Sequence, residues 1–197
     1  MSLYRALAAM VIVAATAAPA RAQETIVFLR HGEKPSGGLG QLTCQGLNRA
    51  LALPDVLINQ FGRPDFVYAP NPNVKMSDPA GSFYYVRPLA TIEPTAIQAG
   101  RSVNTHYGFN ETSGLQSLLI QSAKANTTIF VVWEHSYLVK IVQSIMSRYG
   151  DGTPVPAWTT GDYDSLYVVK VDYAGGTIHA HFEHDHEGLN GLRTTCP

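Results

Sequence analysis

Strongly apolar runs of strand length alternate along this chain with segments of helical periodicity. The clearest runs are TIVFL (25–29), DFVYA (65–69) and TTIFVVW (127–133). A strand that is apolar at consecutive positions has to be covered on both faces, as strands are in parallel sheets. The order strand, helix, strand, helix therefore predicts an α/β fold, a three-layer α/β/α sandwich around a mainly parallel sheet.

The longest helical segment follows the first run. In residues 42–62, Thr43 near the start is a good N-cap residue, and Gly62 at the end is a good C-terminal stop. Pro54 lies in the middle, where a proline removes a backbone hydrogen bond and clashes with the preceding turn. We therefore expect two short helices here.

The rest of the chain divides into further helices, one short strand, a loop and a hairpin. Helical patterns occupy 87–100, 114–125 and 137–148, the last with Leu138, Ile141, Val142 and Ile145 on one face, and a short strand is expected at 102–105. Near the C-terminus, SLYVVKVDY and TIHAHFEH flank a glycine turn, which predicts an antiparallel hairpin at the sheet edge. Residues 70–86, rich in Pro, Asn, Gly and Ser, are expected to form a loop leading toward the functional site.

The first 22 residues have the pattern of an export signal. Arg5 precedes the apolar run LAAMVIVAATAA, which ends at the small-x-small pattern Ala20-Arg21-Ala22. This predicts a signal peptide over 1–22, a single catalytic domain over 23–197, and a periplasmic or secreted location. An uncleaved anchor is the weaker alternative because the run is shorter than about 20 residues. No cysteine follows the run, so a lipid anchor has no attachment residue.

The charge of the chain argues against nucleic acid as a partner. The sequence has 14 basic and 15 acidic residues, and the predicted leader holds two of the basic ones, which leaves a net charge near −3. Nucleic-acid backbones are bound by clustered positive charge. A phosphate group must therefore be held locally, as part of a small-molecule substrate. The sequence gives no indication of oligomeric state.

The chain contains two cysteines, Cys44 and Cys196. In an oxidising compartment two cysteines more often pair than stay free, and such a bond would tie the C-terminal tail to the first helix. Two unrelated thiols remain the alternative, because the separation of the Cα atoms decides.

Cationic and imidazole side chains follow two of the predicted strands. Arg30-His31-Gly32 comes directly after the first strand, and Glu134-His135 comes after the strand at 127–133. Ligands of parallel α/β sheets bind beyond the carboxyl ends of the strands, so both histidines are expected at one rim. A neutral imidazole can attack phosphorus and form a covalent intermediate. Gly32 would let the backbone approach the bound group.

A phosphate site needs more than one fixed cation. Arg87 stands at the mouth of a predicted helix, with Pro88 suited to its first position. Guanidinium groups bind phosphoryl oxygens in bidentate fashion, and a helix N-terminus adds partial positive charge. Arg30 and Arg87 are thus the expected cationic ligands of a phosphoryl group.

These motifs occur in the order found in a known family. They are Arg30-His31-Gly32-Glu33 after a strand, Leu42-Thr43 with Gly46 and Arg49-Ala50, Tyr85-Val86-Arg87 with Thr91 and Thr95-Ala96, and Glu134-His135 after a strand. The chain resembles the histidine phosphatase superfamily, with its phosphoglycerate-mutase-like fold, over residues 25 to about 140.

The resemblance implies that His31 is phosphorylated during turnover and that Arg30, Arg87 and His135 cradle the phosphoryl group. It implies a phosphatase that hydrolyses phosphomonoesters without a metal or other cofactor, and the leader pattern of residues 1–22 predicts that this phosphatase is exported.

Other residues near these motifs are expected to contact substrate. Gly32 and Glu33 follow the nucleophile directly, and Lys34 either attracts anionic substrate or is a solvated loop lysine. No large insertion forms a cap, so specificity is expected from the loops at 34–41, 70–86 and 106–113.

Two glutamates are candidates for the general acid. Glu134 adjoins His135, in the reverse order to one branch of the family, and it replaces the glycine that commonly precedes the second histidine. Glu111, in GFNETSG, has the mutase-like spacing after Arg87. We favour Glu134 as the acid and keep Glu111 as the alternative and as a substrate-binding candidate.

The C-terminal sequence TIHAHFEHDHEG permits a different function. Its histidines are ligands that suit zinc, copper and nickel, although an edge strand and tail can simply hold them in solvent: His179, His181, His184 and His186. The alternative to a phosphatase is therefore a periplasmic metal- or phosphate-ester-binding protein without turnover. A mutase is a third and weaker hypothesis, because an exported protein meets little glycolytic phosphate.

Overall fold

The computed structural model describes residues 23–121 and 126–197, so the predicted signal peptide lies outside the described residues. A six-stranded sheet in the order β5-β2-β6-β1-β7-β8 forms the centre of the molecule. Its strands are β1 (Gln23–Arg30), β2 (Phe66–Tyr68), β5 (Val103–Asn104), β6 (Thr128–Trp133), β7 (Ser165–Ala174) and β8 (Thr177–His186). Strands β5, β2, β6 and β1 are parallel to one another, whereas β7 is antiparallel to both β1 and β8.

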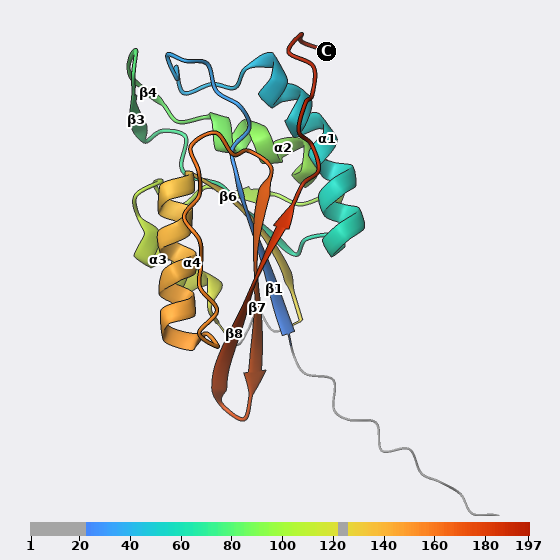
Figure 1. Ribbon diagram of the computed structural model, residues 1–197, viewed down its shortest axis with the longest axis vertical. Helices are drawn as coiled ribbons and strands as arrows, with labels where there is room; N and C mark the ends of the chain where they lie inside the picture. Colours follow the sequence, from blue (N-terminus) through green and yellow to red (C-terminus); the bar gives the residue numbers. More distant parts are fainter. Residues whose placement is uncertain (1–22, 122–125) are drawn as a thin grey trace, which may run out of the picture.

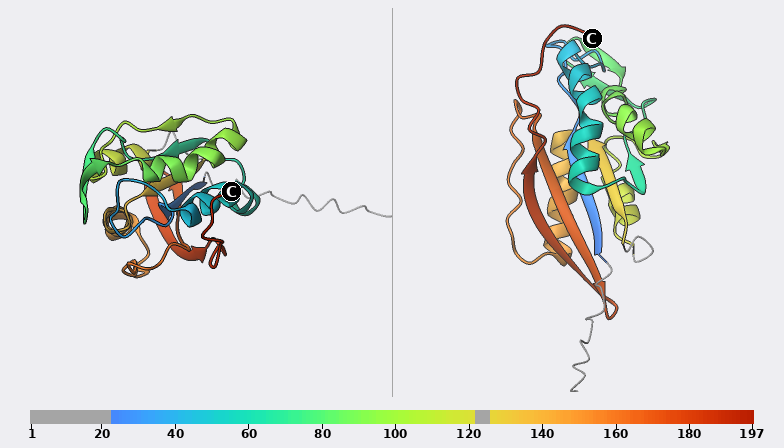
Figure 2. Two further views of the ribbon diagram at one scale, coloured as in Figure 1. Left: turned by 90° about the horizontal axis from the view of Figure 1, so that it is seen from above. Right: turned by 90° about the vertical axis from the view of Figure 1, so that its right-hand side faces the viewer.

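Helices cover both faces of this sheet (Figures 1 and 2). They are α1 (Cys44–Phe61), α2 (Arg87–Ala99), α3 (Thr112–Leu119) and α4 (His135–Tyr149). Successive residues of β1 serve opposite layers: Val27 packs in the core beneath α1 and α2, and Phe28 packs in the core beneath α3 and α4. The predicted three-layer sandwich is confirmed, and so is the C-terminal hairpin.

Helix α1 differs from its prediction. Its ends are as expected, since Thr43 Oγ1 accepts a hydrogen bond from the Gly46 amide at 3.1 Å and the Gly62 amide donates to Ile58 O at 3.0 Å. The expected break at Pro54 is wrong, because the helix continues from Cys44 to Phe61. The fully buried Leu53 and Leu57 hold the helix on the sheet through the proline, so packing outweighs the lost hydrogen bond.

The segment 70–86 is not wholly a loop. Strands β3 (Lys75–Asp78) and β4 (Gly81–Tyr84) form a small antiparallel hairpin in this segment, separate from the main sheet. The hairpin stands beyond the carboxyl end of β1, at the top of the molecule in Figure 1. The expected loop therefore has a defined inner and outer face.

The remaining helices lie close to their predicted positions. Helix α2 runs from Arg87 to Ala99, and Gly100 ends it in the left-handed conformation at φ 66°. Helix α3 covers Thr112–Leu119 instead of 114–125, and residues 122–125 of that prediction lie outside the described residues. The predicted apolar stripe of α4 is fully or almost fully buried: Leu138, Ile141, Val142 and Ile145.

The two cysteines are joined. Cys44 at the start of α1 and Cys196 form a disulfide, with Cα atoms 4.5 Å apart across 152 residues of sequence. Asn48 of α1 supports the same connection by donating hydrogen bonds to the carbonyls of Arg193 and Thr195. The tail is thus fixed against the helix that follows the Arg-His-Gly motif. Among the described residues, no helix has the length and apolar character needed to cross a membrane.

Candidate active site

The two chemistry-bearing motifs emerge side by side from the sheet. Arg30, the last residue of β1, is paired in register with Trp133, the last residue of β6. Neighbouring strands lie about 4.8 Å apart, so His31 and Glu134 begin at the same edge on adjacent strands. The β3–β4 hairpin and the start of α2 lie at this edge as well (Figure 1). The expected meeting of these segments at one rim is confirmed.

The imidazole of His31 is buried and held in one tautomer. Only 2% of the residue is exposed. Its Nδ1 lies 2.7 Å from the carbonyl oxygen of Gly32, which can only accept, so Nδ1 carries the proton and Nε2 is unprotonated. Arg87 Nε donates to this Nε2 at 3.3 Å. The reactive nitrogen therefore faces the guanidinium group expected to hold a phosphoryl group.

Burial lowers the pKa of His31 well below its usual value, and the positive charge of Arg87 lowers it further. Arg30 and Lys34 act in the same direction, whereas the Gly32 carbonyl raises the pKa. The imidazole is consequently neutral near neutral pH. A neutral ring is the form that can attack phosphorus.

Arg30 is held by a loop that the sequence did not single out. Its NH1 atom donates to the carbonyl oxygens of Thr160 at 2.6 Å and Asp162 at 2.9 Å, and its guanidinium lies 4.1 Å from the ring centre of Tyr163. Its Nε is buried and has no hydrogen-bond partner among the described residues. This unsatisfied donor is available to an anionic ligand.

Arg87 is engaged by an acidic residue of the hairpin. Asp78 Oδ2 accepts from Arg87 NH1 at 2.7 Å, and Asp78 Oδ1 accepts from Arg87 NH2 at 3.1 Å. Met76, two residues earlier on β3, places its sulfur 3.4 Å from NH2. Sequence reasoning missed Asp78, although it identified the surrounding segment as functional. The available signal was the sequence KMSD of β3, in which Met76 and Asp78 are two residues apart and therefore share one face of a strand.

Asp78 is a carboxylate in this arrangement. Burial raises the pKa of its carboxyl group, but hydrogen bonds from Arg87 and from the Gly40 amide outweigh that effect, and the pKa is lowered. Lys34 Nζ lies 3.5 Å from Asp78 Oδ1 and adds a further positive charge. A fixed anion therefore engages both terminal nitrogens of Arg87.

Glu134 caps helix α4. One carboxylate oxygen accepts from the amides of Ser136 at 2.8 Å and Tyr137 at 3.0 Å, and the other lies 2.7 Å from Nδ1 of His135. Burial acts to raise the pKa of Glu134, but the contact with His135 and the two amides lower it overall. Glu134 follows Trp133, which is paired in register with Arg30, so it stands at the same sheet edge as the Arg-His-Gly motif. Its carboxyl group is ionised in this structure.

The remaining predicted site residues have mainly structural contacts. A side chain at Gly32 would place its Cβ 2.9 Å from the backbone oxygen of Gly46, so the glycine allows a close approach to α1. Glu33 accepts three hydrogen bonds from Arg49, and Glu111 accepts one from the Gly108 amide at 2.6 Å. These contacts hold the loops that surround the site.

Arg49 is the centre of a buried ionic cluster next to the Arg-His-Gly motif. Besides Glu33, it contacts Glu187 at 2.5 Å and Asp164 at 3.6 Å. Burial raises the pKa of Glu187 to about 8, although the positive charge of Arg49 opposes this. One guanidinium thus serves three carboxyl groups, and it connects the segment after β8 to the residue that follows Gly32.

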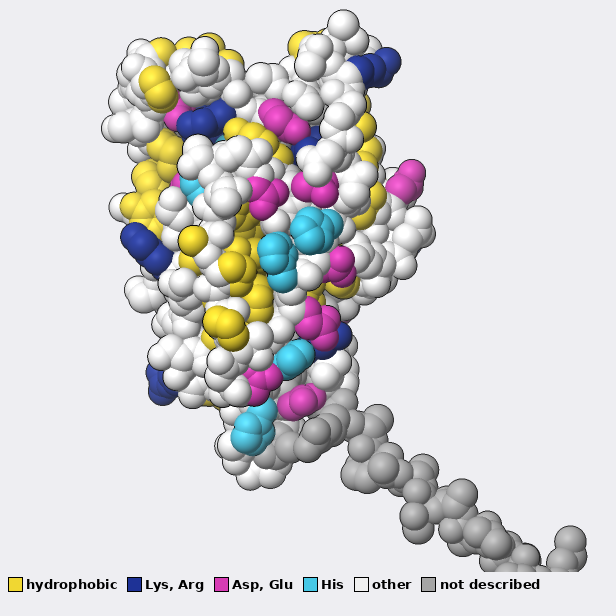
Figure 3. Space-filling view, viewed as in Figure 1, with side chains coloured by type: hydrophobic (Ala, Val, Ile, Leu, Met, Phe, Trp, Pro, Cys, Tyr) yellow, Lys and Arg dark blue, Asp and Glu magenta, His cyan; other side chains and the backbone are white. Residues whose placement is uncertain are grey.

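The C-terminal histidines lie along β8, and histidine side chains are visible among acidic ones on the face shown in Figure 3. His181 Nδ1 lies 2.6 Å from Asp151, and His184 Nε2 lies 2.8 Å from Ser165 Oγ. Within the described ranges, no group of three or more histidine, cysteine, aspartate or glutamate side chains converges as a metal site would require. The arrangement gives the metal-binding hypothesis no support.

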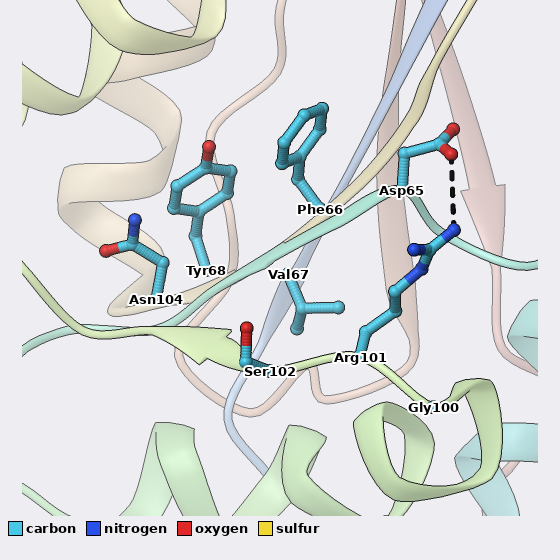
Figure 4. Close-up of a pocket in the computed structure, with 8 residues that line it drawn as sticks. All are labelled: Asp65, Phe66, Val67, Tyr68, Gly100, Arg101, Ser102 and Asn104. Carbon is cyan, nitrogen blue, oxygen red and sulfur yellow. Dashed lines mark hydrogen bonds and ion pairs between the residues drawn. The ribbon is translucent and has the colours of Figure 1, made fainter.

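The surface has two hollows of interest, and only one of them contains a candidate catalytic residue. One, of about 330 Å³, runs along β2 and β5 and is shown in Figure 4. It contains the ion pair of Arg101 with Asp65 at 3.4 Å but none of the candidate catalytic residues. The other, an open cleft of about 490 Å³, lies between the β3–β4 hairpin and α4 and includes Glu134. The second cleft adjoins Arg87, because Met76 lines it and lies 3.4 Å from Arg87 NH2.

Comparisons with known proteins identify the fold. No family model and no curated protein matches the chain. A solved structure described as a phosphohistidine phosphatase, SixA, from Nakamurella multipartitia has 18% identity and a TM-score of 0.54, and the match covers 83% of this chain and 96% of that one. A mycobacterial glucosyl-3-phosphoglycerate phosphatase has 13% identity and a TM-score of 0.54, over 90% of this chain and 100% of that one.

A phosphoglycerate mutase from Plasmodium falciparum is similar at 10% identity and a TM-score of 0.53, over 80% of this chain and 88% of that one. At such identities these likenesses show the fold alone. The structural neighbours belong to the histidine phosphatase superfamily, and the predicted phosphoglycerate-mutase-like fold is confirmed.

Proposed function

We propose that this chain is an exported phosphatase that hydrolyses phosphomonoesters of small molecules through a covalent phosphohistidine on His31. The observation that carries the proposal is the buried, neutral imidazole whose unprotonated Nε2 accepts a hydrogen bond from Arg87. Phosphatases among the proteins of similar fold support phosphoryl hydrolysis as the class of reaction. Export rests on the leader pattern of residues 1–22.

In the first step, the lone pair of His31 Nε2 attacks phosphorus and the bond to the leaving oxygen breaks. Arg87 and the unsatisfied Nε of Arg30 would bind the phosphoryl oxygens, and His135 at the start of α4 would add a donor. The proton on Nδ1 stays in place, because the Gly32 carbonyl holds it. The phosphorylated ring therefore carries a positive charge, which makes the N–P bond ready to break.

The leaving oxygen needs a proton as it departs. We assign this role to Glu134, which follows the residue paired with Arg30 across β1 and β6 and lines the adjacent cleft. Glu134 is ionised without substrate, so it must take up a proton as the phosphoryl anion binds. In the second step it removes a proton from the water that attacks phosphorus. Inorganic phosphate leaves, and His31 returns to its neutral form.

A direct test detects the intermediate. After rapid quenching of enzyme mixed with an aryl phosphate, we expect intact mass and phosphorus NMR to reveal one acid-labile, base-stable phosphoryl group that is absent from His31→Ala. Hydrolysis should be insensitive to chelators. Binding of the ester without turnover or phosphorylation, in protein with wild-type folding, would favour the phosphate-ester-binding alternative instead.

A further inference from the structure

The open cleft beside the candidate active site has a mixed apolar and cationic lining. One wall is β3 of the hairpin, and the other is the first turns of α4 with the loop before α3. The lining residues that matter here are Lys75, Met76, Phe109, Glu134, Tyr137 and Lys140. A volume of about 490 Å³ falls within the usual range of small-molecule sites.

The cleft lies next to the candidate phosphoryl site. The sulfur of Met76, on its hairpin wall, is 3.4 Å from NH2 of Arg87. The ring of Tyr85 connects the two regions, with its centre 6.0 Å from that of His31 and 5.5 Å from that of Phe109. A phosphoester whose phosphorus faces His31 would therefore extend its leaving group into this cleft.

The lysines of the cleft differ from the others that the structure describes. Lys34 pairs with Asp78 at 3.5 Å, and Lys170 pairs with Glu183 at 2.7 Å. Lys75 and Lys140 have no carboxylate within 4.0 Å among the described residues, and both line the cleft. Two unneutralised cations thus flank one opening in a chain with a slight excess of acidic residues.

Lys140 has the better position of the two. Its ammonium group lies 4.9 Å from the ring centre of Tyr137, which itself lines the cleft. The Lys75 ammonium lies 5.0 Å from the ring centre of Tyr84, which is paired with Lys75 across the hairpin. Lys140 is therefore expected to contribute more to binding in the cleft than Lys75.

The apolar part of the lining consists of flat or flexible side chains. The rings of Phe109 and Tyr137 meet at 5.5 Å in an edge-to-face arrangement, and Met76 faces the site from the hairpin. Aromatic and thioether surfaces of this kind pack well against a planar apolar group.

We propose that this cleft binds the leaving group of the substrate and selects flat, apolar leaving groups that carry a second anionic group, which Lys140 and, more weakly, Lys75 would bind. The inference rests on the proposed phosphatase function for its biological meaning. Glu134 is negatively charged in the same cleft, but its carboxylate already accepts hydrogen bonds from the amides of Ser136 and Tyr137. The anionic group is therefore placed at the Lys140 end of the cleft.

The test compares two esters of equal size, meta-(carboxymethyl)phenyl phosphate and the corresponding carboxamide. Dissociation constants are measured by calorimetry in a His31→Asn background, so that turnover is not needed. We expect the carboxylate ester to bind roughly 5- to 10-fold more tightly at low ionic strength, and the difference to shrink as salt is added.

Variants of the lysines locate the effect. In the same background, Lys140→Gln should bring the ratio of the two constants to about 1, and Lys75→Gln should reduce it roughly two-fold. Lys170→Gln, which alters a lysine of β7 outside the cleft, should leave the ratio unchanged. Equal binding of the two esters to the parent protein, or an unchanged ratio in Lys140→Gln, would overturn the inference.

The two proposals fail in different ways. If the protein with an intact His31 hydrolyses both esters at the same kcat/KM, the phosphatase proposal stands and the leaving-group selection is wrong. If it hydrolyses neither ester while the binding ratio responds to Lys140→Gln, the cleft binds as inferred and the phosphatase proposal is wrong. The carboxamide ester, bound equally by all lysine variants, shows that their folding is intact.

Discussion

The carboxylate of Asp78 accepts hydrogen bonds from both terminal nitrogens of Arg87, at 2.7 and 3.1 Å, while Nε of the same guanidinium faces His31. Asp78 comes from the β3–β4 hairpin, nine residues before Arg87, and its side chain is 2% exposed. A phosphoryl group would need the same donors. Under the proposed function, the hairpin therefore places an anion in competition with substrate for Arg87.

Replacement of Asp78 by asparagine should strengthen phosphate binding. The amide keeps the size of the side chain but removes the charge that offsets Arg87, so we expect inorganic phosphate to bind about 3- to 10-fold more tightly. Competitive inhibition of aryl phosphate hydrolysis measures this constant. Asp172→Asn, on the surface of β7, serves as the control. Weaker binding in Asp78→Asn would instead show that the carboxylate orients Arg87 for the ligand.

His31 should remain neutral in mildly acidic solution. Burial and the charge of Arg87 lower its pKa, so the ring loses its nucleophilic lone pair only when the pH falls below that lowered value. Nitrogen NMR of the imidazole should show the Nδ1–H tautomer with little change as the pH falls through the range in which an ordinary histidine titrates. In Arg87→Met, where that charge is absent, the midpoint should move upward. Titration of the parent ring near its usual value would contradict the arrangement described.

The identity of the general acid can be read from leaving-group dependence. Glu134→Gln should slow hydrolysis of an alkyl phosphate by about 100-fold or more, because its leaving oxygen needs a proton, and should slow para-nitrophenyl phosphate much less. Glu111→Gln should alter both only slightly, since Glu111 is bound to the Gly108 amide. The ratio of kcat/KM for the two esters is the measurement. An equal loss on both esters in Glu134→Gln would remove it from this role.

The buried cluster around Arg49 should make folding stability depend on pH. The pKa of Glu187 rises on folding from its ordinary value near 4.5 to about 8, so the folded protein keeps a proton that the unfolded chain releases. Stability from this group is complete below about pH 4.5 and is lost as the pH rises toward 8, by up to about 1.4 kcal/mol per pH unit.

Chemical denaturation at several pH values tests the sign of this effect. Glu187→Gln, which cannot ionise, should remove this part of the slope, whereas Glu183→Gln, on the exposed pair with Lys170, should retain it. A variant whose stability has the same pH dependence as the parent would show that Glu187 is ionised in the folded state.

Much of the fold could be predicted because it depends on local pattern. Runs such as TIVFL and TTIFVVW are apolar at consecutive positions, and this pattern placed them at the centre of a covered parallel sheet. Thr43 and Gly62 marked the ends of α1 by their capping preferences. The break predicted at Pro54 was wrong, because the free energy gained by packing the long buried face of α1 exceeds the local cost of a proline inside a helix.

The candidate site was only partly predictable. Arg30-His31 stands at the end of one predicted parallel strand, and Glu134 stands at the end of another. Because parallel strands end at the same edge of a sheet, these positions were enough to predict that the residues share one edge, which the pairing of β1 with β6 shows. The contacts of Asp78 with Arg87, and of Thr160 with Arg30, depend on how loops fold back over that edge. No periodic pattern encodes such contacts.

The sequence by itself determined which segments are strands and helices and which side chains stand at the strand ends, because hydrophobic periodicity and capping act over a few residues. Only the tertiary structure decided that Cys44 meets Cys196, that Asp78 pairs with Arg87, and that Lys140 lines the cleft between the hairpin and α4. These arrangements join residues far apart in the chain or on separate elements, and they are fixed by the packing of the whole domain.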